Sequence, residues 1–583
     1  MINFKNLKFP KGFSKSLFLI IISVQCFSAN HLSAEGSLKW DFSTKKTWWL
    51  KHESISEFEK SIDELNDQVN DLISNSNYSK LGGSQNFVSL VSNLYWAKSF
   101  CLPFLNELEI KKEETFKEIQ LMSSSDVDVA QYLTKYSHFK DNRSRVTEIL
   151  LDLRKHDPSL FKEYIKLAVA VSLVWDTEFP ENWPHHNVNK NDLPIDDSSY
   201  LGIYKFFINS QVGGKLFYDP RRMTVRELCF VVDSPLAQNE LQYAQQIKIK
   251  KIRDLANLYK IIPYDQNRIN GSVYVWPHGQ YNLIKIGAKN GGICMDQSFF
   301  VSQTSKAMGI PSILFTGQGR TGAHAWLGTF DLSSGWNFEV GKWENENYPI
   351  GYALDPQTWK QTTNSELEFY LKSSGDSPSS LRGKAFLALS LINENTSKFT
   401  ELVRYSASII PRSIEPWEIE YKKLNDSRAD LKSFGRFWSR WINNFKEERG
   451  LKAKGQISLL RIFNQLGMTS KAESLSKQII NENKSKRFDL GISIAYEEIE
   501  ALHNQLKWDQ AQQKFILALN NFGKDKTGGH LFYNLIQPYV QRCFQFKKFD
   551  EIDAAKELSE KYIERVSGTI LDNDFKLLFD QIR

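Results

Sequence analysis

The centre of the fold is decided by one stretch of the chain, Asn290-Gly-Gly-Ile-Cys-Met-Asp-Gln-Ser-Phe-Phe-Val-Ser-Gln-Thr-Ser-Lys-Ala-Met-Gly-Ile-Pro311. Two glycines just before the cysteine permit a tight approach of the backbone, and the closing Gly-Ile-Pro is a typical helix stop. The stretch therefore predicts a helix that begins near Cys294 and ends near Met308.

Cys294 is predicted to lie at the N-terminus of this helix. The unpaired N–H groups there and the positive end of the helix dipole favour a thiolate over a thiol, which is the first requirement of a cysteine nucleophile. The same N–H groups could stabilise an oxyanion. The position of Cys294 therefore indicates nucleophilic chemistry.

A histidine follows on a predicted strand. Residues 312–316 form an apolar run, a glycine-rich turn comes next, and a second run extends over residues 323–330. On such a strand His324 and Trp326 share one face, with His324 at the end nearest the turn. A base at a strand end that faces a thiol at a helix start is a workable Cys-His pair.

Residues 292–330, together with Ala353-Leu354-Asp355-Pro356-Gln357-Thr358, resemble the transglutaminase-like superfamily. That family places a cysteine at the start of a helix closed by Gly-Ile-Pro, then a His-Ala-Trp strand and an Asp-Pro-Thr strand end. The resemblance covers roughly residues 250–370. It implies a papain-like core with a catalytic triad of Cys294, His324 and Asp355. In this triad the thiolate attacks a carboxamide or peptide carbonyl, and water or an amine resolves the acyl-enzyme.

The third member of the triad has two candidates. Asp355 has the Asp-Pro context of the family but lies farther from His324 along the chain than in compact members, which requires an inserted loop over residues 342–351. Glu339 is closer to the usual spacing and lacks the proline. Asp355 is preferred, although an aspartate before proline is also common in plain turns. Whichever residue acts is expected to orient the imidazole and stabilise the imidazolium.

Two other motifs receive structural interpretations. Residues 317–322 match G-x-G-x-x-G, but a dinucleotide fingerprint must open a helix and this run leads into a strand. It is interpreted as a mobile turn that borders the active site, with Arg320 available to a substrate. The adjacent His185 and His186 have no further ligand at a recognised spacing, so they are assigned to a loop. Neither a metal nor a cofactor is expected.

The flanking regions are predicted to be helical. Apolar residues recur at spacings of three and four over residues 55–72, and weaker patterns cover residues 115–122, 146–153 and 160–174. Between residues 226 and 369 the pattern changes to short apolar runs, which also suggest strands at residues 230–232 and 273–276.

After residue 374 three segments with a shared pattern begin at residues 468, 508 and 549. This spacing suits stacked helical hairpins, with an ordinary helical bundle as the alternative. The whole is therefore α+β and mostly α. A papain-like transglutaminase core (residues 226–372) lies between an N-terminal helical domain (35–225) and a C-terminal helical-repeat-like, TPR-like domain (373–583).

The N-terminal segment is interpreted as a secretory signal peptide over residues 1–34. Four lysines precede an apolar stretch that is too short for a spanning helix, which disfavours an uncleaved anchor. These lysines contribute most of the net charge of +6, so nothing points to nucleic acid. No membrane span is expected, and the protein is predicted to be exported to the periplasm or the extracellular space.

Besides Cys294 and Cys26, which lies in the predicted signal peptide, the cysteines are Cys101, Cys229 and Cys543. They lie far apart in the sequence and form no disulfide framework. They are expected to be buried apolar residues, with at most one bridge.

Two functions are consistent with these features. The first is a cysteine peptidase, amidase or acyltransferase that acts on a peptide or protein substrate, with hydrolysis preferred over crosslinking. The second is a non-catalytic scaffold that binds a protein partner through its C-terminal helical repeats.

Overall fold

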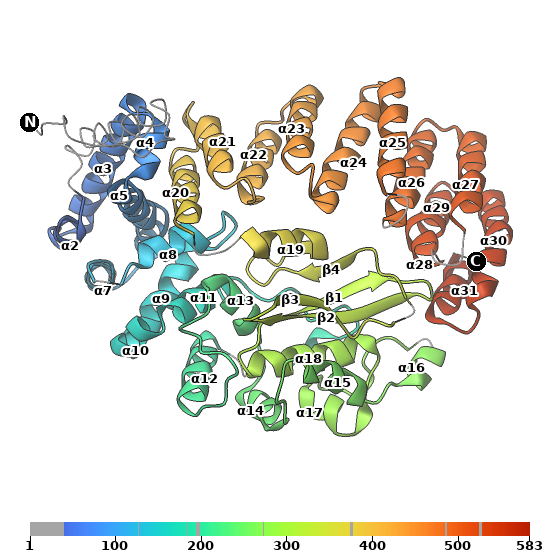
Figure 1. Ribbon diagram of the computed structural model, residues 1–583, viewed down its shortest axis with the longest axis horizontal. Coiled ribbons are helices and arrows are strands. Elements are labelled where there is room, and N and C mark those ends of the chain that lie inside the picture. Colours follow the sequence, from blue (N-terminus) through green and yellow to red (C-terminus); the bar gives the residue numbers. More distant parts are fainter. Residues whose placement is uncertain are drawn as a thin grey trace, which may run out of the picture.

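The computed structural model describes residues 40–125, 127–181, 183–193, 199–271, 273–344, 346–373, 377–483, 487–523 and 528–582. The chain is mostly helical, with one five-stranded antiparallel sheet at its centre (Figure 1). The predicted signal peptide lies outside the described residues. Within the described part of the chain, no helix is long and apolar enough to cross a membrane.

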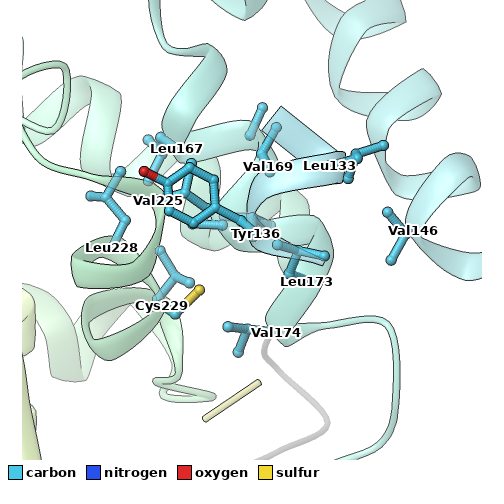
Figure 2. Packing of buried hydrophobic residues seen from close by; sticks show 14 of the residues in the cluster. Leu133, Tyr136, Val146, Leu167, Val169, Leu173, Val174, Val225, Leu228 and Cys229 are labelled. Atoms are coloured by element: carbon cyan, nitrogen blue, oxygen red, sulfur yellow. The ribbon is translucent and has the colours of Figure 1, made fainter. Parts of the chain in front are cut away.

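The N-terminal region is a helical bundle, as its periodicity predicts. Its helices are α2 (Phe42–Leu50), α3 (Ile55–Asn75), α4 (Tyr78–Gly83), α5 (Gln85–Trp96), α6 (Leu102–Glu107), α7 (Lys112–Ser123), α8 (Val129–Tyr136), α9 (Arg143–His156), α10 (Pro158–Glu163), α11 (Ile165–Val174), α12 (Tyr200–Val212) and α13 (Val225–Val232). Helix α3 starts at the N-cap Ser54 and buries Phe58, Ile62 and Val69 along one face. Side chains from α8, α9, α11 and α13 meet in the core shown in Figure 2.

Two predicted strands are wrong. Residues 230–232 end helix α13, because Thr224 and Glu227 form a capping box that starts a helix there. Residues 273–276 form no strand because a side chain takes up their acceptors: the Arg268 guanidinium donates to the carbonyls of Val273 (3.1 Å) and Tyr274 (2.6 Å).

The central region places a buried helix against the sheet. The helices are α14 (Gln238–Gln246), α15 (Asp254–Ile261), α16 (Gln266–Asn270), α17 (Leu283–Lys285) and α18 (Cys294–Ala307). The strands are β1 (Ser312–Gln318), β2 (Ala323–Asp331), β3 (Gly335–Val340), β4 (Gly351–Leu354) and β5 (Gln361–Thr363), in the order β3-β2-β1-β4-β5. Helix α18 packs on β1 and β2 and ends before Gly309, whose φ is +73°. The predicted helix and the two predicted strands at 312–316 and 323–330 are confirmed.

The C-terminal region is an arc of helices that runs over the sheet (Figure 1). The helices are α19 (Asn364–Ser373), α20 (Pro378–Ile392), α21 (Phe399–Ile409), α22 (Glu415–Asp426), α23 (Leu431–Asn444), α24 (Arg449–Gln465), α25 (Thr469–Asn483), α26 (Phe488–Asn504), α27 (Trp508–Phe522), α28 (Gly528–Leu531), α29 (Gln537–Gln545), α30 (Phe549–Ile563) and α31 (Ile570–Ile582).

The sequence pattern at residues 468, 508 and 549 marks the second helix of three hairpins. Helices α25, α27 and α30 start at residues 469, 508 and 549, and each packs on the helix or helical turn before it. The preceding turns share one geometry, because Gly467, Leu506 and Lys547 have φ values of +66°, +58° and +56°.

The predicted boundary near residue 373 does not separate two cores. Helix α20 packs against α5 and α8 of the N-terminal bundle, and the ring of Phe386 lies 5.7 Å from that of Phe87. The far end of the arc touches the sheet again, because the Gly529 N–H donates to the Gly319 carbonyl between β1 and β2 (3.0 Å). The C-terminal arc therefore contacts the N-terminal bundle at one end and the central sheet at the other.

Candidate active site

Cys294 is the first residue of α18, where the sequence predicts it. The backbone before it follows a path that only glycine permits. A Cβ on Gly291, whose φ is +63°, would lie 2.1 Å from the Pro263 oxygen, and one on Gly292 would lie 2.3 Å from the Asp296 Cβ. The two glycines thus let the 263–265 segment and the first turn of α18 close on each other.

Asp296 fixes the start of the helix from inside. Its carboxylate accepts hydrogen bonds from the Ile293 N–H (2.9 Å), the Arg268 guanidinium (2.7 Å) and the Tyr281 hydroxyl (3.1 Å). The side chain is fully buried, so the Arg268 charge compensates it. Sequence analysis missed this pair because the aspartate lies in the quoted stretch while its arginine lies on α16.

The thiol of Cys294 is closed off from solvent. Its residue is 5% exposed and packs in an apolar cluster with Ile269, Ala325 and Ile570 among its members. Burial raises the pKa of the thiol to about 11, although the N–H groups of Ala325, Met295 and Cys294 itself act to lower it. The expectation of a thiolate at the helix start is therefore not met in this structure, because desolvation outweighs the helix terminus.

His324 lies on β2, and the residue is 2% exposed. Its Nε2 atom lies 2.8 Å from the carbonyl oxygen of Gly341. A carbonyl only accepts, so Nε2 carries the hydrogen and the lone pair of the neutral ring is on Nδ1. Nδ1 is buried and has no hydrogen-bond partner. Burial lowers the pKa of His324 to about 4, against the raising effect of the bond to Gly341, so the ring is neutral at pH 7.

Aromatic rings enclose the imidazole. The ring centroids of Trp343, Tyr348 and Trp326 lie 4.3, 5.4 and 6.3 Å from that of His324. The Tyr348 hydroxyl is buried without a hydrogen-bond partner. Burial raises the pKa of Tyr348 above its usual range, and the charges of Glu346 and of an ionised Cys294 raise it further. The hydroxyl is thus an unsatisfied donor within electrostatic reach of the thiol.

The structure brings the thiol to the backbone beside His324 without joining the two side chains. The N–H of Ala325 acts on the thiol, and Ala325 packs in the same cluster as Cys294. His324 and Trp326 share the face of β2 opposite to Ala325, and Nδ1 accepts no hydrogen bond from the sulfur. The thiol therefore lies near the backbone of β2 beside His324, and it makes no hydrogen bond with the imidazole.

Asp355 does not contact His324, so the predicted orienting role is not seen. It follows β4, and its carboxylate pairs with the buried Arg226 and accepts from the backbone N–H groups of Gln357 (3.1 Å) and Thr358 (3.0 Å). Burial acts to raise the pKa of Asp355, but the charge and hydrogen bonds of Arg226 lower it overall. Asp355 caps a turn, and the Gly341 carbonyl is the hydrogen-bond partner of His324 Nε2.

Glu339 is not a partner of the imidazole either. Its side chain is 69% exposed and pairs with Lys342 at 2.8 Å. The backbone carbonyl that replaces both acids gives no signal in a sequence, since every residue carries one.

The glycine-rich turn of residues 319–322 joins β1 to β2, as expected of a run that leads into a strand. Glu346 accepts from the Arg320 N–H (2.5 Å) and the Thr321 hydroxyl (2.9 Å). The Leu571 N–H donates to the Thr321 carbonyl at 3.0 Å. The turn is therefore held from two sides, which differs from the mobile turn that the composition suggests.

A cavity of about 180 Å³ is lined by residues of α18, β1 and β4. Its lining includes Met295, Phe299, Lys306, Asp233 and His185. Lys306 and Asp233 form a buried ion pair, and His185 Nε2 lies 3.0 Å from the Tyr281 hydroxyl. No group of three or more His, Cys, Asp or Glu side chains in the described ranges is arranged to hold a metal ion.

Three other cysteines lie in the described part of the chain. Cys101, Cys229 and Cys543 are free and buried, as their apolar interpretation predicts. Burial raises the pKa of each thiol, to about 12 for Cys229 and Cys543.

No protein-family model, curated protein or solved structure matches this chain.

Proposed function

We propose that this chain is an exported cysteine peptidase or amidase of the transglutaminase-like type, with Cys294 as nucleophile and His324 as base. One observation carries the proposal: a neutral imidazole has its hydrogen fixed on Nε2 by the Gly341 carbonyl and a free, buried Nδ1, and its residue adjoins Ala325, which packs with the helix-start Cys294. A buried nitrogen without a partner is costly in a purely structural site. A thiol proton would satisfy it.

The reaction follows from these groups. Nδ1 takes the proton of the Cys294 thiol, and the sulfur attacks the carbonyl carbon of an amide to form a tetrahedral oxyanion. The C–N bond breaks as the protonated Nδ1 returns its proton to the leaving amine, which leaves a thioester on Cys294. Water, deprotonated by Nδ1, then attacks the thioester and releases the acid. An amine in place of water would give acyl transfer.

The oxyanion needs donors near the sulfur. The N–H groups at the start of α18 are unpaired by the helix and supply one set. The Tyr348 hydroxyl is the side-chain donor we assign, because it is buried, unsatisfied and electrostatically coupled to Cys294. An oxyanion would accept the hydrogen bond that Tyr348 lacks in the free protein.

A non-catalytic scaffold is the second candidate, and the buried thiol with its raised pKa favours it. In that case the hairpins of α24–α31 bind a protein partner and the central domain serves only the fold.

A peptide-library cleavage profile tests the choice. The wild-type chain is expected to release fragments, and Cys294→Ala is expected to release none. Cys101→Ala is the matched control, because it removes a buried free thiol of the N-terminal bundle. Equal cleavage by wild type and Cys294→Ala would contradict the enzyme. No cleavage by wild type, together with a Cys294 thiol that iodoacetamide does not alkylate, would favour the scaffold.

A further inference from the structure

The end of the helical arc covers the candidate nucleophile. Ile570, the first residue of α31, packs in the same apolar cluster as Cys294. A Cβ added to Gly322 in the β1–β2 turn would lie 2.9 Å from the Ile570 Cβ, so the two segments are in close contact. The small apolar cluster that buries Cys294 is therefore covered in part by the start of α31.

Backbone hydrogen bonds attach this cover to the β1–β2 turn. The Leu571 N–H donates to the Thr321 carbonyl and the Gly529 N–H to the Gly319 carbonyl, both at 3.0 Å. A Cβ on Gly529 would lie 2.3 Å from the Gly319 oxygen, so only glycine allows this approach.

A second attachment lies on the other side of the thiol. The Asn573 amide donates to the Ile269 carbonyl of α16 (3.0 Å), and the Tyr274 hydroxyl donates to Asp574 (3.1 Å). The Tyr533 hydroxyl also donates to Asp574. Together, the two attachments hold Ile570 against the apolar cluster that contains Cys294.

The cover belongs to a body with its own core. Leu571, Phe575 and Phe579 of α31 pack with residues of α27, α29 and α30, whereas Ile570 packs with the catalytic cluster. Contact with the site therefore rests on the Ile570 side chain, on a few hydrogen bonds and on the approach of residues 528–533 to the β1–β2 turn. Such a contact can open without loss of either core.

We infer that the face formed by residues 528–531 and 570–574 is a removable cover that keeps Cys294 latent, and that a polypeptide substrate replaces it. This inference rests on the proposed function and adds to it the form of the substrate. When the cover leaves, the carbonyls of Gly319 and Thr321 lose their N–H partners. An extended polypeptide supplies such N–H groups at regular spacing, whereas a small amide does not.

Uncovering also changes the chemistry of the thiol. Burial is the largest cause of its raised pKa, so entry of water weakens the main effect that opposes the N–H groups of Ala325 and Met295. The α18 terminus can then act on an exposed thiol, as it does in reactive cysteines.

The test compares alkylation of Cys294 by iodoacetamide in three full-length proteins, followed by mass spectrometry. The double variant Asn573→Ala/Asp574→Ala removes the second attachment. Asp580→Ala/Gln581→Ala is the matched control, because both residues are exposed on the same helix. We expect alkylation to be at least about tenfold faster in the first variant, since access limits the reaction of a buried thiol, and unchanged in the control.

Hydrogen exchange and a stronger variant decide a negative result. If the alkylation rate does not change although the amides of Leu571 and Gly529 lose protection, the cover does not control access and the inference is overturned. If those amides stay protected, Ile570→Lys places a charged side chain at the apolar cluster that contains Cys294, which is expected to displace the start of α31. An unchanged alkylation rate in that variant overturns the inference as well.

The pH dependence separates the inference from the proposed function. Faster alkylation with a midpoint at or above the ordinary thiol value of about 8.5 would support the cover and contradict an activated nucleophile. A midpoint well below that value supports both. Unfolded casein, used as a polypeptide probe, is expected to accelerate alkylation of the wild type. Acetamide, a small amide, is expected to have no effect. Equal effects of the two would contradict a polypeptide as the group that replaces the cover.

Discussion

The Nε2 atom of His324 lies 2.8 Å from the carbonyl oxygen of Gly341, two residues beyond Glu339 at the end of β3. A backbone group therefore stands where a triad would place a carboxylate. A carbonyl orients the ring and selects the tautomer as an acid does, but it carries no full charge to stabilise an imidazolium. The base is therefore oriented by the Gly341 carbonyl and by neither Asp355 nor Glu339.

Asp355→Ala is expected to lower stability without changing the base. The substitution leaves the guanidinium of Arg226 buried and unpaired, which costs about 3 to 5 kcal/mol of unfolding free energy. Urea unfolding measures that loss. The pH profile of Cys294 alkylation should match the wild type, because Asp355 does not touch His324. Glu339→Gln should change neither quantity, and a shifted alkylation profile in either variant would restore that acid to the triad.

Gly341→Ala should disturb the base itself. Gly341 has a φ of +90°, and an added Cβ would lie 2.5 Å from Cε2 of Tyr259. Strain and clash are expected to cost about 2 to 4 kcal/mol, and the displaced carbonyl should release Nε2. Nitrogen-15 NMR of the imidazole reports the tautomer. Gly335→Ala is the matched control, because its φ is +80° but nothing lies within 4 Å of the added Cβ. A fixed Nε2 tautomer in Gly341→Ala would contradict the role of the carbonyl.

Tyr348→Phe should slow acylation selectively. The ring that packs on His324 and Trp326 is kept, and only the hydroxyl is lost. Loss of an oxyanion donor typically costs about 100-fold in rate, so acylation by a p-nitrophenyl ester should fall by about that factor. Alkylation by iodoacetamide forms no oxyanion and should not change. A parallel loss in both reactions would mean that the hydroxyl positions the thiol instead.

Acid should destabilise the fold through its buried histidines. Burial lowers the pKa of His324 to about 4, of His185 to about 3 and of His503 to about 4. The unfolded chain binds these protons near pH 6.5, so the stabilisation is complete above that pH and is lost as the pH falls toward the folded values. Each group is expected to account for on the order of 2 kcal/mol between pH 7 and pH 4.

The variant His503→Phe checks this origin. Neither ring nitrogen of His503 has a hydrogen-bond partner, and its ring packs between Trp508 and Tyr539, so phenylalanine fills the same site. Urea midpoints at pH 7, 5.5 and 4.5 should fall less steeply than in the wild type. The exposed His278→Phe should keep the wild-type slope. Parallel slopes in all three proteins would place the acid sensitivity elsewhere.

Local patterns were sufficient for the central elements. The glycine pair, the closing Gly-Ile-Pro and the alternation after it predicted α18, β1 and β2 at their observed positions. The repeated pattern at residues 468, 508 and 549 matches three helix starts, at residues 469, 508 and 549. By contrast, residues 230–232 were misassigned because a short apolar run does not distinguish a buried strand from the end of a buried helix.

The site was predicted in its positions and not in its contacts. Cys294 and His324 lie on the predicted elements, but the pairing of Asp355 with Arg226 joins residues 129 positions apart. The group at Nε2 is a backbone carbonyl, which no residue type identifies. Neither fact could come from spacing, since both depend on how β3 and α13 pack around the sheet.

Backbone sterics and the period of apolar residues act over a few positions, so the sequence predicted which residues start the helix and the strand. The state of the thiol depends on the packing of distant segments. Desolvation raises its pKa, and Ile570 packs against the cluster that contains Cys294 because the C-terminal arc returns to the β1–β2 turn. A helix terminus favours a thiolate within its own turn, and burial by a distant segment outweighs it.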